Sequence, residues 1–408
     1  MELTLDEAKD VLRYIIKNNR ALQEKGQSPV SISLCGAAGI GKSQVCEQIA
    51  QEIDSNYIRL NLSQLTDPSE IVGWPYQEYH VCRGDECDWI SAKLIDAYTA
   101  NGWIITPETR MSYAVPAWIE GLDLNKPTIL LLDDYNRTSQ AIMQAVMEII
   151  CRQEYISWKL PPNSTIILTE NPDDGNYDTN GYDEAFATRF MRFNVKFDVN
   201  SWARYAENAR LDDRAQNFML AYSSEIMKEN AQHRHPVNAR NYTMFANTIS
   251  GIENWEDPKS LALILQIASG AFLDDKDNTI GALFTNFIAN KLDKLISPEE
   301  LLTGDWKKVA PKIEKCVYDD NGNYKPLVAS ILHTRLLNYS MYYFEQKGAK
   351  TDVVEQRLID LIDTNDDPDK KMLFSEDFLF DIIKQLVGKY KARTNKLLLN
   401  AKIRNKIL

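Results

Sequence analysis

The chain has 408 residues, enough for two or three domains, of which 44% are hydrophobic and 25% are charged. These proportions are typical of a soluble globular protein, and no apolar run approaches the ~20 residues of a membrane-spanning helix. The acidic N-terminus lacks the order of a signal peptide, so we expect a cytoplasmic protein without membrane contact. The net charge of −12 argues against a grip on nucleic acid by the whole surface.

The N-terminal stretch predicts a helix, a strand and a second helix. Residues 4–24 begin with a Thr or Asp cap and carry apolar residues at helical spacing. Residues 30–34 are rich in β-formers, and residues 44–50 again have helical spacing. Between them lies Gly36-Ala-Ala-Gly-Ile-Gly-Lys-Ser43, which fits the phosphate-binding pattern G-x-x-x-x-G-K-[ST].

Each fixed position of this P-loop has a chemical reason. The glycines let the backbone turn tightly, so that successive N–H groups point at phosphate oxygens. Lys42 brings a positive charge to the β- and γ-phosphates, and Ser43 offers a hydroxyl to Mg²⁺. The loop also opens a helix N-terminus, which favours anions. We therefore expect a nucleoside triphosphate with Mg²⁺, bound by Gly36, Gly39, Ile40, Gly41, Lys42, Ser43 and Gln44.

The next segment is less regular. Residues 57–62 alternate as a second strand, and a turn-rich stretch follows. We interpret residues 76–126 as an irregular insertion between core elements, with a short helix near 89–99. It holds His80, Cys82 and Cys87, which resemble half of a metal site. Since no second cysteine pair follows at ligand spacing, we expect reduced thiols without a metal.

A buried strand carrying carboxylates comes next. The run Thr128-Ile-Leu-Leu-Leu reads as a strand buried on both faces, and it ends in Asp133 and Asp134. Ligands gather at the carboxyl ends of parallel strands. Asp133 is placed to hold Mg²⁺, and Asp134 to polarise the attacking water. An acidic turn at a strand end is the alternative interpretation, which the upstream P-loop disfavours.

A helix over residues 140–152 precedes a fourth strand, 165–169, that ends in Asn171-Pro172. Asn171 either orients a water molecule beside the phosphates or caps the turn before the proline. After a Gly/Asp/Asn-rich loop, residues 191–197 form the last strand.

The pattern is helical from residue 201 to the end of the chain. We expect an α/β core over 1–199 with its insertion at about 76–126, a helical lid over 200–292 and a helical C-terminal extension over 293–408. Residues 382–408 carry eight Lys or Arg and no acids. They form either a solvated helix face or a docking surface for an acidic partner or nucleic acid.

The order of these pieces resembles the AAA+ ATPases of the MoxR-like, dynein-related branch, with bacterial and phage members looking most similar, over residues 25–255. Besides the P-loop, the resemblance rests on Gly73-Trp-Pro75, Val115-Pro-Ala-Trp118, Asp133-Asp-Tyr-Asn-Arg137, Asn171-Pro172, Thr188-Arg-Phe190 and Pro236-Val-Asn-Ala-Arg240. It implies an AAA+ P-loop core with a five-stranded parallel sheet, followed by the lid and the extension.

The resemblance also implies a ring, expected to be a homo-hexamer, with ATP held between subunits. Arg189 would then serve the neighbour's γ-phosphate, with Arg192 as a less favoured candidate because it lies in a strand. Arg240 would reach the γ-phosphate of its own chain from the lid. One position departs from the family: the catalytic Glu is here Asp134, one methylene shorter, which leaves the hydrolysis rate open.

The favoured function is a Mg-ATP-dependent ring ATPase that, like MoxR-type chaperones, remodels or assembles a protein partner. Relatives in this branch often work beside von Willebrand A-type proteins, so the resemblance makes such a protein the most specific expectation. Two alternatives stay open. The basic tail suits a nucleic-acid motor or a restriction or packaging component, and Asp134 suits a switch that assembles on ATP with little hydrolysis. The preference for ATP over GTP is a family expectation.

Overall fold

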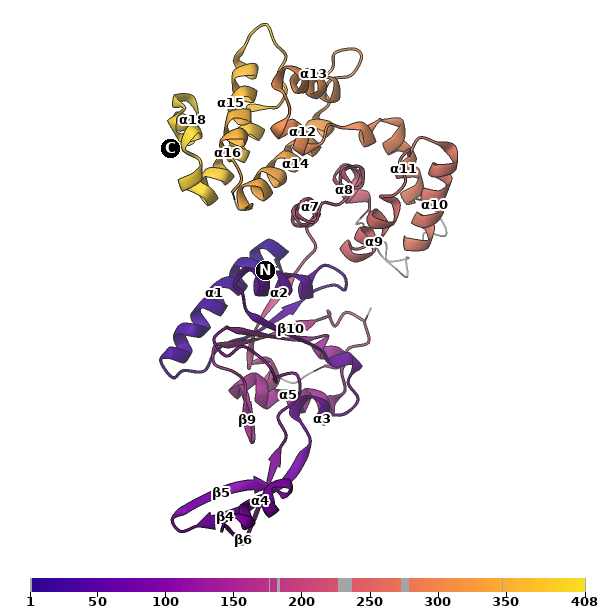
Figure 1. Cartoon of the computed structure of the whole chain (residues 1–408). Coiled ribbons are helices and arrows are strands. Elements are labelled where there is room, and N and C mark those ends of the chain that lie inside the picture. Colours follow the sequence, from indigo (N-terminus) through magenta and orange to yellow (C-terminus); the bar gives the residue numbers. More distant parts are fainter. Residues whose placement is uncertain are drawn as a thin grey trace. The chain divides into compact units, whose positions relative to one another are not determined.

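The computed structural model of the chain describes residues 2–175, 177–181, 184–226, 237–272, 279–346 and 348–407 (Figure 1). They fall into two compact units, Met1–Lys196 and Phe197–Leu408. The first is built on a parallel sheet, and the second is helical.

The sheet of the first unit has six parallel strands in the order β1-β11-β2-β10-β7-β3. Their bounds are β1 Glu2–Leu3, β2 Ser31–Cys35, β3 Asn56–Asn61, β7 Thr128–Asp133, β10 Ser164–Glu170 and β11 Phe190–Val195. The expected five strands are all present, and every residue of β2, β7 and β10 is buried. The sixth strand, β1, was missed because two residues are too few to show an alternating pattern.

Helices flank this sheet, namely α1 (Leu5–Glu24), α2 (Lys42–Glu52), α3 (Ser69–Val72), α5 (Gln140–Arg152) and α6 (Glu184–Ala187), with short 3₁₀ turns η1 (Leu62–Gln64) and η3 (Tyr135–Arg137). The predicted N-terminal helix is confirmed, and its cap is a reciprocal one. The Glu7 N–H donates to the Thr4 hydroxyl at 3.3 Å, and the Thr4 N–H donates to the Glu7 carboxylate at 2.8 Å. The predicted helix over 140–152 is also confirmed.

The insertion is regular from residue 75 to residue 113, so the expectation of an irregular segment was wrong there, while the short helix expected near 89–99 is present at Ile95–Ala100. It forms an antiparallel sheet in the order β5-β4-β6, separate from the six-stranded sheet (Figure 1). The bounds are β4 Pro75–Arg83, β5 Glu86–Ser91, η2 Ala92–Leu94, α4 Ile95–Ala100 and β6 Ile104–Tyr113. Most residues of these strands are exposed, so neither face demands the clean alternation that identifies a half-buried strand. A further two-stranded hairpin, β8 (Glu154–Tyr155) with β9 (Trp158–Lys159), was also missed.

The cysteine expectation needs a correction as well. Cys82 and Cys87 form a disulfide that links β4 to β5, and were expected to be reduced. The two residues are direct partners in the strand register, which brings their side chains to the same face. The cysteines at 35, 46, 151 and 316 are free.

The second unit contains the helices α7 Val199–Asn208, α8 Asp213–Ile226, α9 Ala239–Ile249, α10 Pro258–Phe272, α11 Thr279–Ala289, η4 Leu292–Lys294, α12 Pro298–Thr303, α13 Trp306–Val317, α14 Pro326–Glu345, α15 Asp352–Asp366, α16 Glu376–Tyr390, η5 Lys391–Arg393, α17 Asn395–Leu399 and α18 Ala401–Ile407. One apolar cluster runs through them, from Trp202 to Ile403. This cluster includes residues on both sides of residue 292, so the expected division into a lid and an extension at that residue stays a prediction. None of the described helices is long and apolar enough to cross a membrane.

A buried ion-pair network ties three helices of this unit together. The Arg335 side chain on α14 is 1% exposed, and its guanidinium donates to the Glu207 carboxylate on α7 at 3.1 and 3.3 Å. It also contacts Asp213 and Asn217 on α8. Burial raises the pKa of Glu207, and the Arg335 charge offsets only part of this effect.

We expect the substitution Arg335→Met to destabilise the second unit by about 3–5 kcal/mol, because it leaves the Glu207 carboxylate buried without its cation. Because the pKa of Glu207 is raised in the folded state, folding becomes less favourable as the pH rises through that pKa. The loss of stability in Arg335→Met should therefore shrink at acid pH, where Glu207 is protonated. Denaturant unfolding of the full chain measures both effects. The matched control is Lys389→Met, which removes an exposed pair with Glu345 and should cost less than about 1 kcal/mol. Equal losses in the two variants would contradict the prediction.

Candidate nucleotide-binding site

The P-loop lies between β2 and α2, and its glycines are required by the local geometry. A Cβ atom at Gly36 would lie 2.3 Å from the Val195 carbonyl oxygen, which no side chain tolerates. Gly39 and Gly41 have φ values of +77° and +109°, in the region that L side chains rarely adopt. The backbone therefore takes a turn that only this glycine pattern permits.

Lys42 is almost completely buried against this loop. Its ammonium donates to the carbonyl oxygens of Gly36 at 2.6 Å and Ala37 at 3.0 Å. It also lies 3.5 Å from the Asn171 side-chain oxygen. The charge is thus held at the mouth of the loop, beside the end of β10. Of the other loop residues, Ile40 is buried, while Gln44 is exposed and lies 3.3 Å from Glu47.

The strand order explains how distant segments meet at this loop. β10 lies between β2 and β7, so the carboxyl ends of three neighbouring strands converge. The Ser43 hydroxyl donates to Asp133 Oδ1 at 2.8 Å, and the Thr169 hydroxyl donates to the same oxygen. The structure therefore brings together the two residues that the sequence assigned to Mg²⁺.

Arg59 on β3 occupies the other side of the Asp133 carboxylate. Its Nε and Nη2 donate to Asp133 Oδ2 at 2.8 and 2.5 Å, in a two-pronged ion pair. Burial acts to raise the pKa of Asp133, but the hydrogen bonds from Thr169 and Ser43 and the Arg59 charge outweigh it. The pKa of Asp133 is therefore lowered, and the group is an anion at neutral pH.

Asp134 and Asn171 lie next to this pair. Asp134 has a left-handed backbone with φ +54°, and its N–H donates to the Thr169 hydroxyl at 3.0 Å. Its carboxylate accepts a hydrogen bond of 3.2 Å from the Asn171 side chain. Asn136 fixes Asn171 through two further hydrogen bonds to its backbone, of 2.7 and 3.1 Å. The Asn171 side chain thus faces both Asp134 and Lys42.

Arg189 lies at the amino-terminal ends of the parallel strands, whereas its own P-loop lies at their carboxyl ends. It directly precedes β11, whose first residue, Phe190, pairs with Ser31 at the start of β2. The P-loop begins after the end of β2, and that five-residue strand spans about 16 Å at ~3.3 Å per residue. The residue is exposed. An arginine side chain does not span this distance, so Arg189 does not reach the P-loop of its own chain.

The other two arginines lie in different surroundings. Arg192, on β11, is 3.5 Å from the buried Glu170 carboxylate and 3.0 Å from the Cys35 sulfur of the same chain. Arg240 is exposed in the first turn of α9, in the second unit, where Asn238 caps the helix. Pro236, part of the segment that resembles sensor two, lies outside the described residues. The role expected for Arg240 therefore stays a prediction.

Three residues at the site were not identified from the sequence: Arg59, Thr169 and Tyr177. Arg59 and Thr169 become candidates only once β3 and β10 are known to flank β7, because each sits near the end of its strand beside Asp133. The Tyr177 hydroxyl accepts a hydrogen bond of 3.1 Å from the Ala38 N–H, which belongs to the P-loop. Nothing in the sequence of the loop that carries Tyr177 indicates that its side chain reaches the P-loop.

The donor set fits Mg²⁺ and a triphosphate. A hydroxyl and a carboxylate are the oxygen ligands that Mg²⁺ prefers, and an ammonium beside a glycine-rich loop suits phosphate oxygens. These features define a P-loop nucleoside triphosphatase site on a parallel α/β sheet.

Comparisons with known proteins specify the family. Residues 31–190 match the model of the AAA domain, dynein-related subfamily. These residues form an AAA+ ATPase domain of this subfamily, and domains of this family bind nucleotide. The chain is also 28% identical over 168 residues to midasin of Giardia intestinalis. That match covers 41% of this chain but only 3% of the midasin.

Solved structures match over much of the chain at low similarity. An inferred ATPase of Cytophaga hutchinsonii is 14% identical, with 85% of this chain and 78% of that chain covered and a TM-score of 0.30. A lysine-to-arginine mutant of Thermotoga maritima RuvB is 11% identical, with 79% and 93% covered and a TM-score of 0.39. These TM-scores are too low to support a conclusion about this chain.

The Arg59–Asp133 pair leads to a prediction about Mg²⁺. A guanidinium and Mg²⁺ compete for one carboxylate, so Arg59→Ala should lower the Mg²⁺ concentration needed for half-maximal nucleotide binding several-fold. Titration of Mg²⁺ at fixed nucleotide, followed by fluorescence of a labelled ATP analogue, measures this. Lys126→Ala, which removes an exposed pair with Asp54, is the control. An unchanged or higher Mg²⁺ requirement in Arg59→Ala would show that the two cations do not compete.

Proposed function

We propose that the chain is a Mg-ATP-dependent, ring-forming AAA+ ATPase that remodels or assembles a protein partner. The observation that carries the proposal is the contact of Ser43 with Asp133, beside Lys42 and Asn171, at the ends of three adjacent strands. Phosphoryl transfer needs a cation on the phosphates, oxygen ligands for Mg²⁺ and a group that orients the attacking water, and these four side chains would supply them close together.

The roles of the residues follow from their places. Ser43 and Asp133 would hold Mg²⁺, while Lys42 and the loop amides would hold the phosphates. Mg-ATP supplies the phosphoryl group that is transferred to water. Asp134, hydrogen-bonded to Asn171, would take a proton from that water and orient it. Asp134 is shorter than the glutamate of relatives, so its hydrogen bond to Asn171 is the positioning device on which the rate would depend.

Ring formation is supported by the position of Arg189. It is exposed and too distant from the P-loop of its own chain, so the γ-phosphate that it serves would belong to a neighbouring copy. AAA+ ATPases commonly assemble as oligomers, and we propose a homo-hexamer. Arg192 is less suited to this role, because it lies against Glu170 of its own chain.

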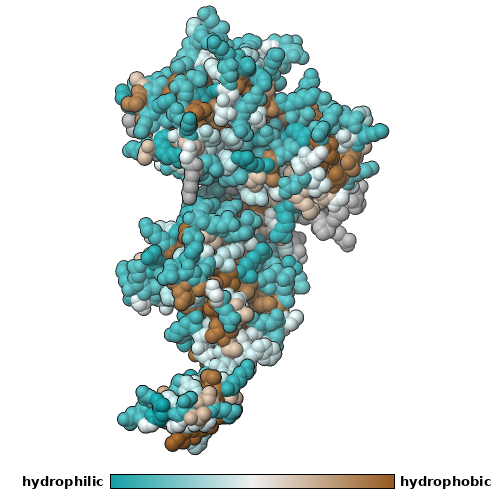
Figure 2. All heavy atoms as spheres, viewed as in Figure 1, coloured by the Kyte–Doolittle hydropathy of each residue, from teal (hydrophilic) through white to brown (hydrophobic). Residues whose placement is uncertain are grey.

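A protein client, with a von Willebrand A-type protein as the specific candidate, is supported by the surface of the insertion. Large apolar side chains are exposed there, and Figure 2 shows apolar atoms gathered at this end of the first unit. Exposed apolar groups of this kind favour protein contacts. They are Leu94, Ile104, Ile105 and Met111 within the insertion and Trp74 directly before β4.

The nucleic-acid alternative loses support. Basic side chains of the C-terminal segment pair with acids of their own unit, with Lys389 at 2.7 Å from Glu345, Lys396 at 3.8 Å from Asp352, and both Lys402 and Lys406 beside Glu376. Their charge is therefore partly neutralised within the fold, as the solvated-face interpretation expects.

The experiment that tests the proposal combines phosphate release with sedimentation. Wild type should release phosphate from Mg-ATP and sediment as a ring when ATP is present. Asp134→Asn should keep the ring but lose release, because the amide cannot accept the proton. If the wild type assembled in ATP but released phosphate no faster than Lys42→Met, the protein would be an assembly switch and the hydrolysis proposal would be overturned. A monomer in Mg-ATP would overturn the ring.

The client is sought with the same variants. The full chain carrying Asp134→Asn should retain a protein partner in Mg-ATP. Lys42→Met should not, since we expect it to bind nucleotide too weakly to assemble on it. Recovery of the same proteins with both variants would show that capture is independent of nucleotide and would count against a remodelling role.

A further inference from the structure

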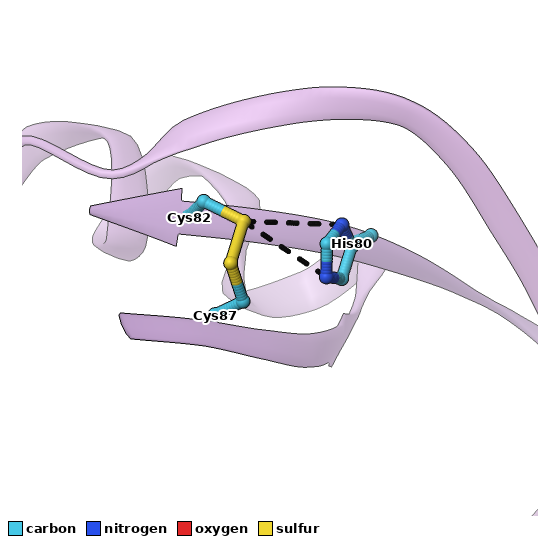
Figure 3. Close-up of side chains that lie close together, drawn as sticks. All are labelled: His80, Cys82 and Cys87. Carbon is cyan, nitrogen blue, oxygen red and sulfur yellow. Dashed lines mark hydrogen bonds between the residues drawn. A yellow bond between two sulfur atoms is a disulfide. The ribbon is translucent and has the colours of Figure 1, made fainter. Parts of the chain in front are cut away.

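Three potential metal ligands meet on one face of the insertion, far along the chain from the P-loop. His80 and Cys82 lie two residues apart on β4, so their side chains share a face of that strand. Cys87 on β5 is the register partner of Cys82. The ligand atoms of the three side chains all lie within 4.8 Å of one another, as Figure 3 shows in close-up.

The histidine is oriented by a second layer of polar groups from β6. Its Nδ1 atom lies 3.0 Å from the Thr106 hydroxyl and 3.3 Å from the Glu108 carboxylate. The ring packs against Trp89, with 4.8 Å between centroids. The Cys82 sulfur lies 3.9 Å from each of the two ring nitrogens of His80 (Figure 3). With Nδ1–H donating to β6, Nε2 is the nitrogen whose lone pair is available to a metal. A carboxylate behind the histidine is the usual support of a metal-binding imidazole.

The spacing suits a tetrahedral ion. Bonds of ~2.3 Å to sulfur and ~2.0 Å to nitrogen imply a sulfur–nitrogen edge of about 3.5 Å and a sulfur–sulfur edge of about 3.8 Å. The observed distance of 3.9 Å from sulfur to Nε2 is close to the first of these. The two sulfurs are bonded to each other in the disulfide. Reduction of that bond lets them separate to the sulfur–sulfur edge of about 3.8 Å.

We propose that the reduced insertion binds a thiophilic divalent cation, represented by Zn²⁺, through Cys82, Cys87 and His80 Nε2, and that the disulfide is the closed, metal-free state of the same site. A thiol reductant supplies two electrons and two protons to the disulfide and is itself oxidised to a disulfide. The two thiols then release two protons as their sulfurs bind the ion. The fourth position is left for water or for a group on a partner.

A purely structural disulfide explains less of the geometry. The hairpin between β4 and β5 is already held by a register of six residue pairs, and the bridge closes a sequence separation of only five. Constraining so short a loop adds little to stability compared with a bridge that closes a long one. It also gives no reason for a histidine held by Thr106 and Glu108 to face the sulfurs.

The test uses the full chain, reduced with a phosphine or left oxidised. Thiol titration under denaturing conditions verifies the states, since reduction should raise the free thiols from four to six. The reduced protein is expected to bind one Zn²⁺ per chain, and Co²⁺ in its place should give a thiolate-to-metal absorption band. The oxidised protein should bind neither ion at this site.

Variants separate the contributions. Cys82→Ser and Cys87→Ser should each abolish the Co²⁺ thiolate band of this site or weaken binding strongly, while Cys151→Ser is the matched control and should leave it intact. Glu108→Gln should weaken binding about 10–100-fold, as expected for a residue that positions the histidine. Reduced protein that takes up no ion, or uptake unaffected by both cysteine variants, would overturn the proposal. Either result leaves the ATPase proposal untouched.

Discussion

Lys42→Met should lower ATP hydrolysis by about 10²–10³-fold, because it removes the cation that the P-loop itself brings to the phosphates. Methionine keeps much of the length and the apolar stem of the side chain, which is almost fully buried against the loop. The fold should therefore survive while the charge is lost. Nucleotide binding should fall with hydrolysis, since Lys42 contacts phosphate in the ground state as well as in the transition state.

The effect is measured by phosphate release and by titration of a fluorescent ATP analogue. Lys126→Met is the control, because this lysine is in the same unit but its partner is the exposed Asp54. Thermal unfolding of both variants should show that neither has lost its fold. Wild-type hydrolysis by Lys42→Met would exclude the P-loop as the site of the reaction.

Arg189→Ala should lower hydrolysis by about 10³–10⁵-fold while nucleotide binding is retained, because an arginine that neutralises transition-state charge acts on the rate and much less on ground-state binding. This pattern differs from that of Lys42→Met, in which binding and hydrolysis fall together. The same two assays, run on full-length protein at saturating Mg-ATP, distinguish the two patterns.

Arg192→Ala is the informative comparison, because Arg192 is three residues away and points at Glu170 and Cys35 of its own chain. We expect a smaller loss of rate in this variant, arising from a disturbed strand β11. If Arg192→Ala lost hydrolysis with binding intact while Arg189→Ala did not, the two arginines would have to exchange roles.

The core of the site was predictable because its signals are local. The P-loop pattern, the apolar run that ends in Asp133 and the strand that ends before Asn171 each occupy a few consecutive residues. Parallel strands place their carboxyl ends at one edge, so local signals sufficed to bring these residues together.

What was missed depends on contacts between distant segments. From the sequence alone, Arg59 reads as a solvent-facing residue of a strand. Only the strand order, in which β3 neighbours β7, shows that it lies beside Asp133. The Cys82–Cys87 bridge depends on the register of a hairpin whose strands are too exposed to show alternation. The strands of the insertion escape prediction from the sequence for the same reason, since all three bury few residues and carry polar side chains on both faces.

The most direct test of a site completed by a neighbouring copy is hydrolysis by a mixture of Asp134→Asn and Arg189→Ala chains. Each variant alone should be almost inactive, the first for lack of the base and the second for lack of the arginine. In a mixed ring, an Asp134→Asn chain offers its intact Arg189 to a neighbour whose Asp134 is intact, so phosphate release should rise well above the sum of the separate rates. A mixture no more active than that sum, under conditions in which the two chains co-assemble, would contradict an arginine supplied in trans.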